Sequence, residues 1–83
     1  PNPFNPITRI TFNIPVDGKV AVNIYDVRGR HVKQIINDRL RSGLHTVSWN
    51  GEDENGIFSS SGIYFYELVA EEYIRKKKMI LLK

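Results

Sequence analysis

The sequence contains no cysteine, only two histidines and no long apolar run. Without cysteine there is neither a disulfide framework nor a thiolate metal site, and two histidines are too few for the N and S ligands of a structural zinc ion. No stretch of about 18 apolar residues is present, so no helix is expected to span a membrane. The sequence also begins without methionine, from which we expect the chain to be part of a longer protein.

The motifs of common catalytic sites are missing as well. There is no phosphate-binding P-loop and no dinucleotide fingerprint, and the serines at 59–61 lack the glycines of a nucleophile elbow. His45 falls on the same strand face as Val47 and Trp49, which favours a histidine hydrogen-bonded within the fold over a catalytic one. The sequence therefore predicts a non-catalytic domain without a cofactor.

Apolar and polar residues alternate along most of the chain, and turn residues separate the alternating segments. These segments are ITFNI at 10–14, KVAVNIYD at 19–26, LHTVSWN at 44–50, IYFYELVA at 63–70 and YIRKKKMILLK at 73–83. A period of two is typical of strands with one buried face. The segment RHVKQIINDRL at 30–40 also fits a helical spacing, but its β-branched residues and its place between two turns favour a strand.

The fold class predicted from this pattern is all-β. We expect a small antiparallel immunoglobulin-like β-sandwich of six to seven strands, the seventh being a short one around Ile57–Phe58. We expect residues 7–83 to form this domain. We expect residues 1–6, with three prolines in PNPFNP, to form a stiff and extended junction with an upstream domain.

The acidic loop NGEDENG could supply hard oxygen ligands to calcium. The candidate ligands are Asn50, Glu52, Asp53, Glu54 and Asn55. Their spacing departs from the helix–loop–helix calcium motif, however, and asparagine, aspartate and glycine are also the residues that turns require. The turn interpretation is therefore preferred, and calcium is the weaker alternative.

The basic run RKKK at 75–78 lies in the last predicted strand. Lysines on both faces favour an edge strand, where they discourage pairing with other chains, over a partner-binding role. A nucleic-acid surface normally adds stacking aromatic residues to such a run, and only Tyr73 is near. Nucleic acid is therefore not an expected partner.

Several segments taken together resemble a known family. They are NPFNP followed by Thr8, YDVRGR at 25–30, SGLHTVSWNGEDENG at 42–56, SGIYFYEL at 61–68 and KMILLK at 78–83. In this order they closely resemble the type A C-terminal sorting domain of the type IX secretion system. The related Ig-like domain of the flagellar hook-capping protein shares the WNGEDENG and SGIYFY style of pattern. Asn50 departs from the aspartate that is frequent in the family, which weakens the calcium alternative further.

The resemblance implies a secretion signal. Such domains end proteins that cross the inner membrane with a signal peptide, and the outer-membrane secretion machinery then reads the domain before the protein is secreted or attached to the cell surface. The expected partners are therefore that machinery and the covalently attached N-terminal cargo, with PNPFNP as the junction. By position in the family pattern, the residues implied in recognition are the last segment, then Gly62 and Tyr64, then Arg30. That last segment comprises Lys78, Met79, Ile80, Leu81, Leu82 and Lys83.

Three alternatives remain open at this stage. Arg30 could simply pair with Asp26 beside its turn. The domain could be a spacer or assembly module, like the hook-capping Ig-like domain, with no sorting role. It could also bind carbohydrate, which would require Phe58, Tyr66 and Tyr73 to form one coplanar exposed strip.

Overall fold

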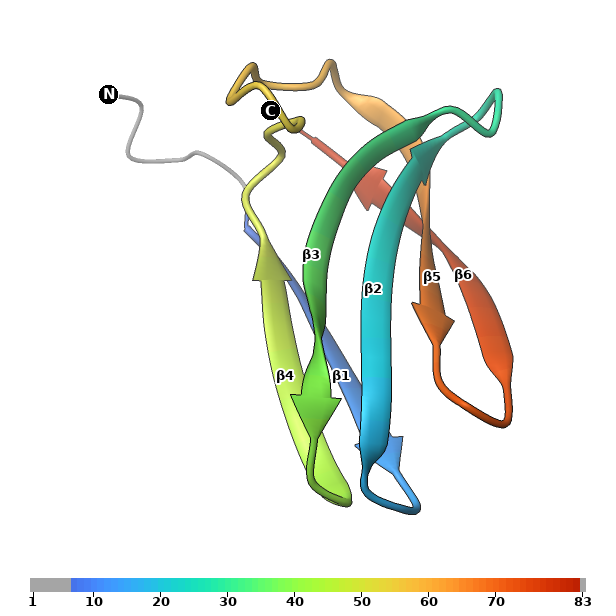
Figure 1. Ribbon diagram of the computed structural model, residues 1–83. Helices are drawn as coiled ribbons and strands as arrows, with labels where there is room; N and C mark the ends of the chain where they lie inside the picture. The colour runs from blue at the N-terminus through green and yellow to red at the C-terminus, as the bar shows by residue number, and fades with distance from the viewer. Residues whose placement is uncertain (1–6, 83) are drawn as a thin grey trace.

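The structure, a computed structural model, describes residues 7–82 and contains six β-strands (Figure 1). The strands are β1 (Thr8–Ile14), β2 (Gly18–Asp26), β3 (His31–Leu40), β4 (Gly43–Trp49), β5 (Gly62–Val69) and β6 (Ile74–Leu81). The predicted junction at 1–6 and the predicted recognition residue Lys83 lie outside the described residues.

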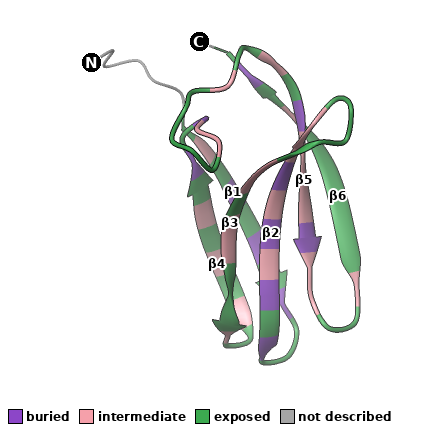
Figure 2. Ribbon diagram, turned by 45° about the horizontal axis from the view of Figure 1, so that its top comes forward, coloured by how far each residue is buried: buried purple, intermediate pink, exposed green. Residues whose placement is uncertain are grey.

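The strands form two antiparallel sheets, one of four strands in the order β3-β2-β5-β6 and one of two strands, β1-β4. The smaller sheet covers one face of the larger, and β6 of the larger sheet extends beyond the edge of the smaller one (Figures 1 and 2). This arrangement confirms the predicted immunoglobulin-like sandwich. Within residues 7–82 no helix is long and apolar enough to cross a membrane.

The segment 31–40 is a strand, as predicted. Its pairing with β2 has register shifts at Val22/Asn23 and Ile24/Tyr25. A bulge places two residues opposite one, so a strict alternation of faces is lost there. This explains why Ile35 and Ile36, although adjacent, are both half-buried.

The seventh strand expected around Ile57–Phe58 does not form among the described residues. Only an isolated bridge between Glu52 and Phe58 is present. Gly51 and Gly56 adopt positive φ angles of 89° and 78°, which turn the chain on both sides of the bridge. The segment between them is therefore too tightly turned to extend a ladder, and six strands is the correct count for residues 7–82.

The core lies between the two sheets and follows the predicted alternation (Figure 2). Its buried residues are Ile10, Phe12, Ile14, Val20, Val22, Ile24, Trp49, Tyr64, Leu68 and Leu81. Each large aliphatic or aromatic side chain removed from water contributes about 1.5–3 kcal/mol. Because the chain has no cysteine, this packing and the sheet hydrogen bonds carry the stability.

Candidate functional site

Most of the predicted recognition residues gather at one end of the four-stranded sheet. The register pairs Asp26 of β2 with Tyr64 of β5, and Tyr64 with Met79 of β6. Two pairs further along β5 and β6, Gly62 lies opposite Leu81. The sequence segments around Arg30, Tyr64 and the last strand are thus neighbours in space, although they are far apart along the chain.

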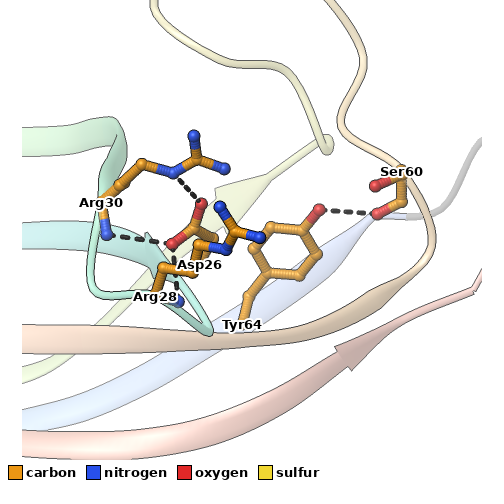
Figure 3. Close-up of polar contacts among 5 residues, drawn as sticks. All are labelled: Asp26, Arg28, Arg30, Ser60 and Tyr64. Atoms are coloured by element: carbon orange, nitrogen blue, oxygen red, sulfur yellow. Dashed lines mark hydrogen bonds and ion pairs between the residues drawn. The ribbon is translucent and has the colours of Figure 1, made fainter.

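The turn after β2 is organised by the Asp26 carboxylate (Figure 3). Its Oδ1 accepts hydrogen bonds of 2.9 Å from the backbone N–H groups of both Arg28 and Arg30. Gly29 takes the positive φ of 81° that the turn requires. The Arg30 backbone N–H above all, and then the Arg30 side chain and the Arg28 N–H, hold the pKa of Asp26 below its ordinary value of 3.8.

Arg30 itself forms the local ion pair that was the alternative to a recognition role. Its Nε donates to Asp26 Oδ2 over 2.9 Å, and this is the single salt bridge found among residues 7–82. The Arg30 side chain is nevertheless 72% exposed, so the pair contributes little to stability. The first role of Arg30 is therefore to close the turn.

Tyr64 is a fold residue at this end. The Tyr64 ring packs edge-on against Trp49 with 5.2 Å between centroids, and its hydroxyl donates to the Ser60 carbonyl over 2.6 Å (Figure 3). The Trp49 Nε1 donates in turn to the Glu52 carbonyl over 2.8 Å. These bonds satisfy the polar atoms of two large buried side chains, as expected for aromatic residues in a core. The burial of Trp49 and Tyr64 confirms the prediction that these two residues are large apolar anchors of the core.

Between the Asp26 turn and the start of β5 lies an open depression of about 490 Å³. Arg28, Arg30 and His31 line one part of it, and the serines at 59–61 line another. Asp26 and Asp53 also border the depression, so its charges are mixed. It offers hydrogen-bonding groups but no concentration of one charge.

The last strand divides its residues between the core and the solvent. Leu81 is 1% exposed and Met79 is half-buried, whereas Ile80 is 59% exposed and Leu82 is 72% exposed. Lys78 is exposed as well. Successive strand residues point to opposite faces, so Met79 and Leu81 turn inward while Lys78 and Ile80 turn outward. The sequence alone did not predict which residues of the last strand are buried, because it did not show which face of that strand is covered.

The centre of the same outer face is occupied by a polar network. Glu67 Oε1 accepts hydrogen bonds from Tyr25 Oη at 3.1 Å and from Asn23 Nδ2 at 3.3 Å. Burial first, and then the bond to Glu67, raise the pKa of Tyr25. Exposed apolar side chains are therefore concentrated toward the ends of this face, with Ile63 and Ile80 paired at one end.

The oxygens of the acidic loop bind backbone amides. Asn50 Oδ1 accepts from the Glu52 N–H at 3.0 Å, and Asp53 Oδ1 accepts from the N–H groups of Asn55 and Ile57 at 2.8 and 3.0 Å. These are the bonds that the turn interpretation expects. Residues 7–82 contain no group of three or more His, Cys, Asp or Glu that could hold a metal ion.

His45 also takes its predicted structural place. Its ring stacks on Phe12 with 5.9 Å between centroids, and its Nε2 is 2.7 Å from the Arg41 carbonyl. The role expected for a histidine hydrogen-bonded within the sandwich is confirmed.

The aromatic strip required for carbohydrate binding is not assembled. Tyr66 and Tyr73 are half-buried and line one groove between β1 and β6, which Phe58 does not line. Phe58 instead bridges Glu52 in the acidic loop. The sequence did not predict this groove, because its lining comes from β1, β5 and β6 and the spacing along β6 alone does not show what lies opposite Arg75 and Lys77.

The comparisons with known proteins decide the family. The model of the FlgD Ig-like domain matches residues 8–73 of this chain. The chain belongs to the FlgD Ig-like domain family. Domains of this family are non-catalytic structural modules.

Two solved structures share the fold of this FlgD Ig-like domain. FlgD from P. aeruginosa is 26% identical with a TM-score of 0.72, and the match covers 92% of this chain and 60% of that one. Dimeric latent PorU from Porphyromonas gingivalis is 22% identical with a TM-score of 0.63, and the match covers 96% of this chain and 10% of that one. The second likeness shows the fold alone. No curated protein matches the sequence.

The predicted edge position of the last strand is confirmed in this FlgD Ig-like domain. β6 ends the four-stranded sheet and pairs only with β5 among the described residues. Its residues Ile74 through Lys78 are all exposed. Lysines at such an edge oppose pairing with another chain, as expected.

Proposed function

We propose that this FlgD Ig-like domain is a sorting module that directs an attached protein through the outer membrane, and that the outward side chains of its last strand are what the secretion machinery contacts. The proposal rests on the resemblance of five sequence segments to the type IX sorting domain. It would place the attached protein in the medium or on the cell surface, by way of the periplasm.

The burial pattern of the last strand is the structural observation that supports the proposed contact with the machinery. Met79 and Leu81 hold the strand in the fold, while Lys78, Ile80 and Leu82 are presented to solvent. We call these last three residues the outer triad. Apolar side chains as exposed as Ile80 and Leu82, beside the exposed Ile63, are typical of surfaces that bind another protein.

A secretion assay tests the proposal. The chain is fused behind a signal peptide and a fluorescent protein in a host with a working type IX system. The test variant carries Ile80→Ser and Leu82→Ser, which remove apolar surface from the outer triad. The matched control is Ile74→Ser, since Ile74 is 63% exposed and lies on the same strand face at its other end.

We expect the parent fusion and the Ile74→Ser control to reach the medium or the cell surface, and the outer-triad variant to stay in the periplasm although it is folded. Circular dichroism of the purified domains checks the folding. If the outer-triad variant is exported as well as the parent, the machinery does not read these side chains. If the folded parent itself stays in the periplasm, the sorting proposal is wrong.

That last result would favour the second candidate, a spacer or assembly module. Its support is the family assignment and the match to FlgD. A spacer does not require an exposed apolar pair on its last strand. The outer-triad variant would then give the same result as the parent in the secretion assay and in circular dichroism. A difference would be expected only in assays of how the whole protein assembles.

A further inference from the structure

A groove of about 590 Å³ runs between β1 and the projecting part of β6, on the opposite face of that strand from the outer triad. Its apolar part is formed by Phe12, Tyr66, Leu68 and Tyr73. Arg75 and Lys77 border it on the β6 side. It lies where the four-stranded sheet extends past the two-stranded one (Figures 1 and 2).

The basic residues of this groove lie on the inner face of β6. Leu81 is buried, so alternation places Lys77 and Arg75 on the same face as Leu81. The register agrees, with Lys77 opposite Tyr66 and Arg75 opposite the buried Leu68. Neither basic residue takes part in a salt bridge among residues 7–82, and no acidic residue lines the groove. A lysine and an arginine thus border an apolar surface without a carboxylate partner.

The opposite wall of the groove is the unpaired edge of β1. Within residues 7–82, β1 pairs only with β4. The Tyr73 hydroxyl donates to the Asn13 carbonyl over 3.2 Å, so this carbonyl points away from β4 and toward the groove. In an antiparallel pair the N–H and C=O of one residue point to the same side, and every second residue repeats the direction. The backbone groups of Thr11 and Arg9 therefore point to the same unpaired edge of β1, and Thr11 lines the groove.

We propose that this groove accepts an extended acidic segment of another protein, which adds a third strand to the β1-β4 sheet. The backbone of the segment bonds to Thr11 and its neighbours on β1, the mode known as β-augmentation. Its inward glutamates or aspartates lay their stems against Tyr66 and reach Arg75 and Lys77 with their carboxylates. The added strand completes a sandwich of seven strands, with three facing four.

The charge of β6 argues against a second copy of this chain as the occupant. A copy that offered its own edge strand β6 would bring four further cations, Arg75 through Lys78, to a groove that is already basic. Like charges in contact disfavour an association. An acidic partner removes this cost and neutralises Arg75 and Lys77.

Binding of a designed peptide tests the proposal. The probe is the blocked and fluorescently labelled peptide Thr-Glu-Val-Glu-Val-Glu-Thr, whose alternation presents glutamates on one face of a strand. Fluorescence anisotropy measures its affinity for the 83-residue chain at low salt, and amide chemical shifts report which backbone groups it contacts. Two control peptides replace all glutamates by lysine, or place proline at positions 3 and 4.

Charge reversal locates the site. The test variant carries Arg75→Glu and Lys77→Glu on the inner face of β6. The matched control carries Lys19→Glu and Lys76→Glu, which change the net charge equally but lie on the outer face of the sheet. All four side chains are exposed, so both variants are expected to fold.

We expect the inner-face variant to bind the peptide roughly tenfold more weakly or worse, and the outer-face variant to stay within about twofold of the parent. The amide signals of Arg9, Thr11 and Asn13 should shift, and neither control peptide should bind. Equal weakening by both variants, tight binding of the proline peptide, or no binding to the parent would each overturn the proposal.

Dextran sulfate in place of the peptide separates a strand-shaped site from a general attraction to polyanions. The proposal is wrong if dextran sulfate binds the parent as tightly as the peptide does and if both variants weaken this binding equally. The basic residues would then attract any polyanion, and the groove would not be a specific binding site. The result is independent of secretion, because the outer triad takes no part in the test.

Discussion

The two halves of β6 have the same alternating backbone but opposite surroundings. From Ile74 to Lys78 both faces are exposed, whereas Leu81 is among the largest fully buried side chains of the domain. The difference lies in what covers the strand: Leu81 packs beneath the loop at Gly51, where a Cβ would already touch its methyl groups at 3.6 Å, while Arg75 and Lys77 border an open groove. This edge strand is therefore buried only where another part of the chain covers it.

The largest expected effect is on the buried half of β6. Leu81→Ala removes a side chain that is 1% exposed and leaves a cavity, so we expect it to lower the free energy of unfolding by about 2–5 kcal/mol. The neighbouring Ile80→Ala is the matched control. Because Ile80 is 59% exposed, its cost should stay below about 1 kcal/mol.

Urea unfolding of the two variants followed by circular dichroism measures this difference. Equal losses for Leu81→Ala and Ile80→Ala would mean that the two faces of the strand are not distinct in solution, and the contrast between the outer triad and the core would be lost.

A smaller effect is expected for Tyr64, which lies opposite Met79 in the buried half. Tyr64→Phe keeps the ring against Trp49 but removes the hydrogen bond to the Ser60 carbonyl. We expect a loss of about 0.5–1.5 kcal/mol in the free energy of unfolding. Tyr66→Phe, on the open groove, should cost less than Tyr64→Phe, and the reverse order would show that the Ser60 bond has no role in stability.

The smallest effect concerns Asp26 and depends on pH. The pKa of Asp26 is lowered in the folded domain, so its ionised form stabilises the fold above the ordinary pKa of 3.8, and this stabilisation is lost as the pH falls through the lower, folded value. Asp26→Asn should therefore be less stable than the parent at neutral pH and approach it in acid. Thermal unfolding between neutral pH and strongly acidic buffer checks this, and a constant difference between the two proteins would contradict it.

The sequence predicted those features that depend on local alternation and turns. Val20, Val22 and Ile24 are buried as their spacing indicates, and β6 is an edge strand as its lysines indicate. The pair Ile35 and Ile36 could not be assigned to one face, because the register shifts between β2 and β3 depend on both strands.

The candidate site was predicted in part. The family pattern named the residues that the fold brings together around Tyr64, but it treated Lys78 through Leu82 as one unit. Which of them are buried depends on which other segments of the chain cover β6, and the groove beside Arg75 depends on the same arrangement. Neither can be read from one strand alone.

The burial of Leu81 has a consequence for biosynthesis. β6 is the last of the six strands to be made, and Leu81 is near its end. While the ribosome is still adding the preceding residues, the core around Trp49 and Tyr64 lacks this side chain, and β5 has an unpaired edge. Full stability is thus reached only when translation has passed Leu81, so that a chain interrupted earlier would carry a weakened domain that proteases can remove.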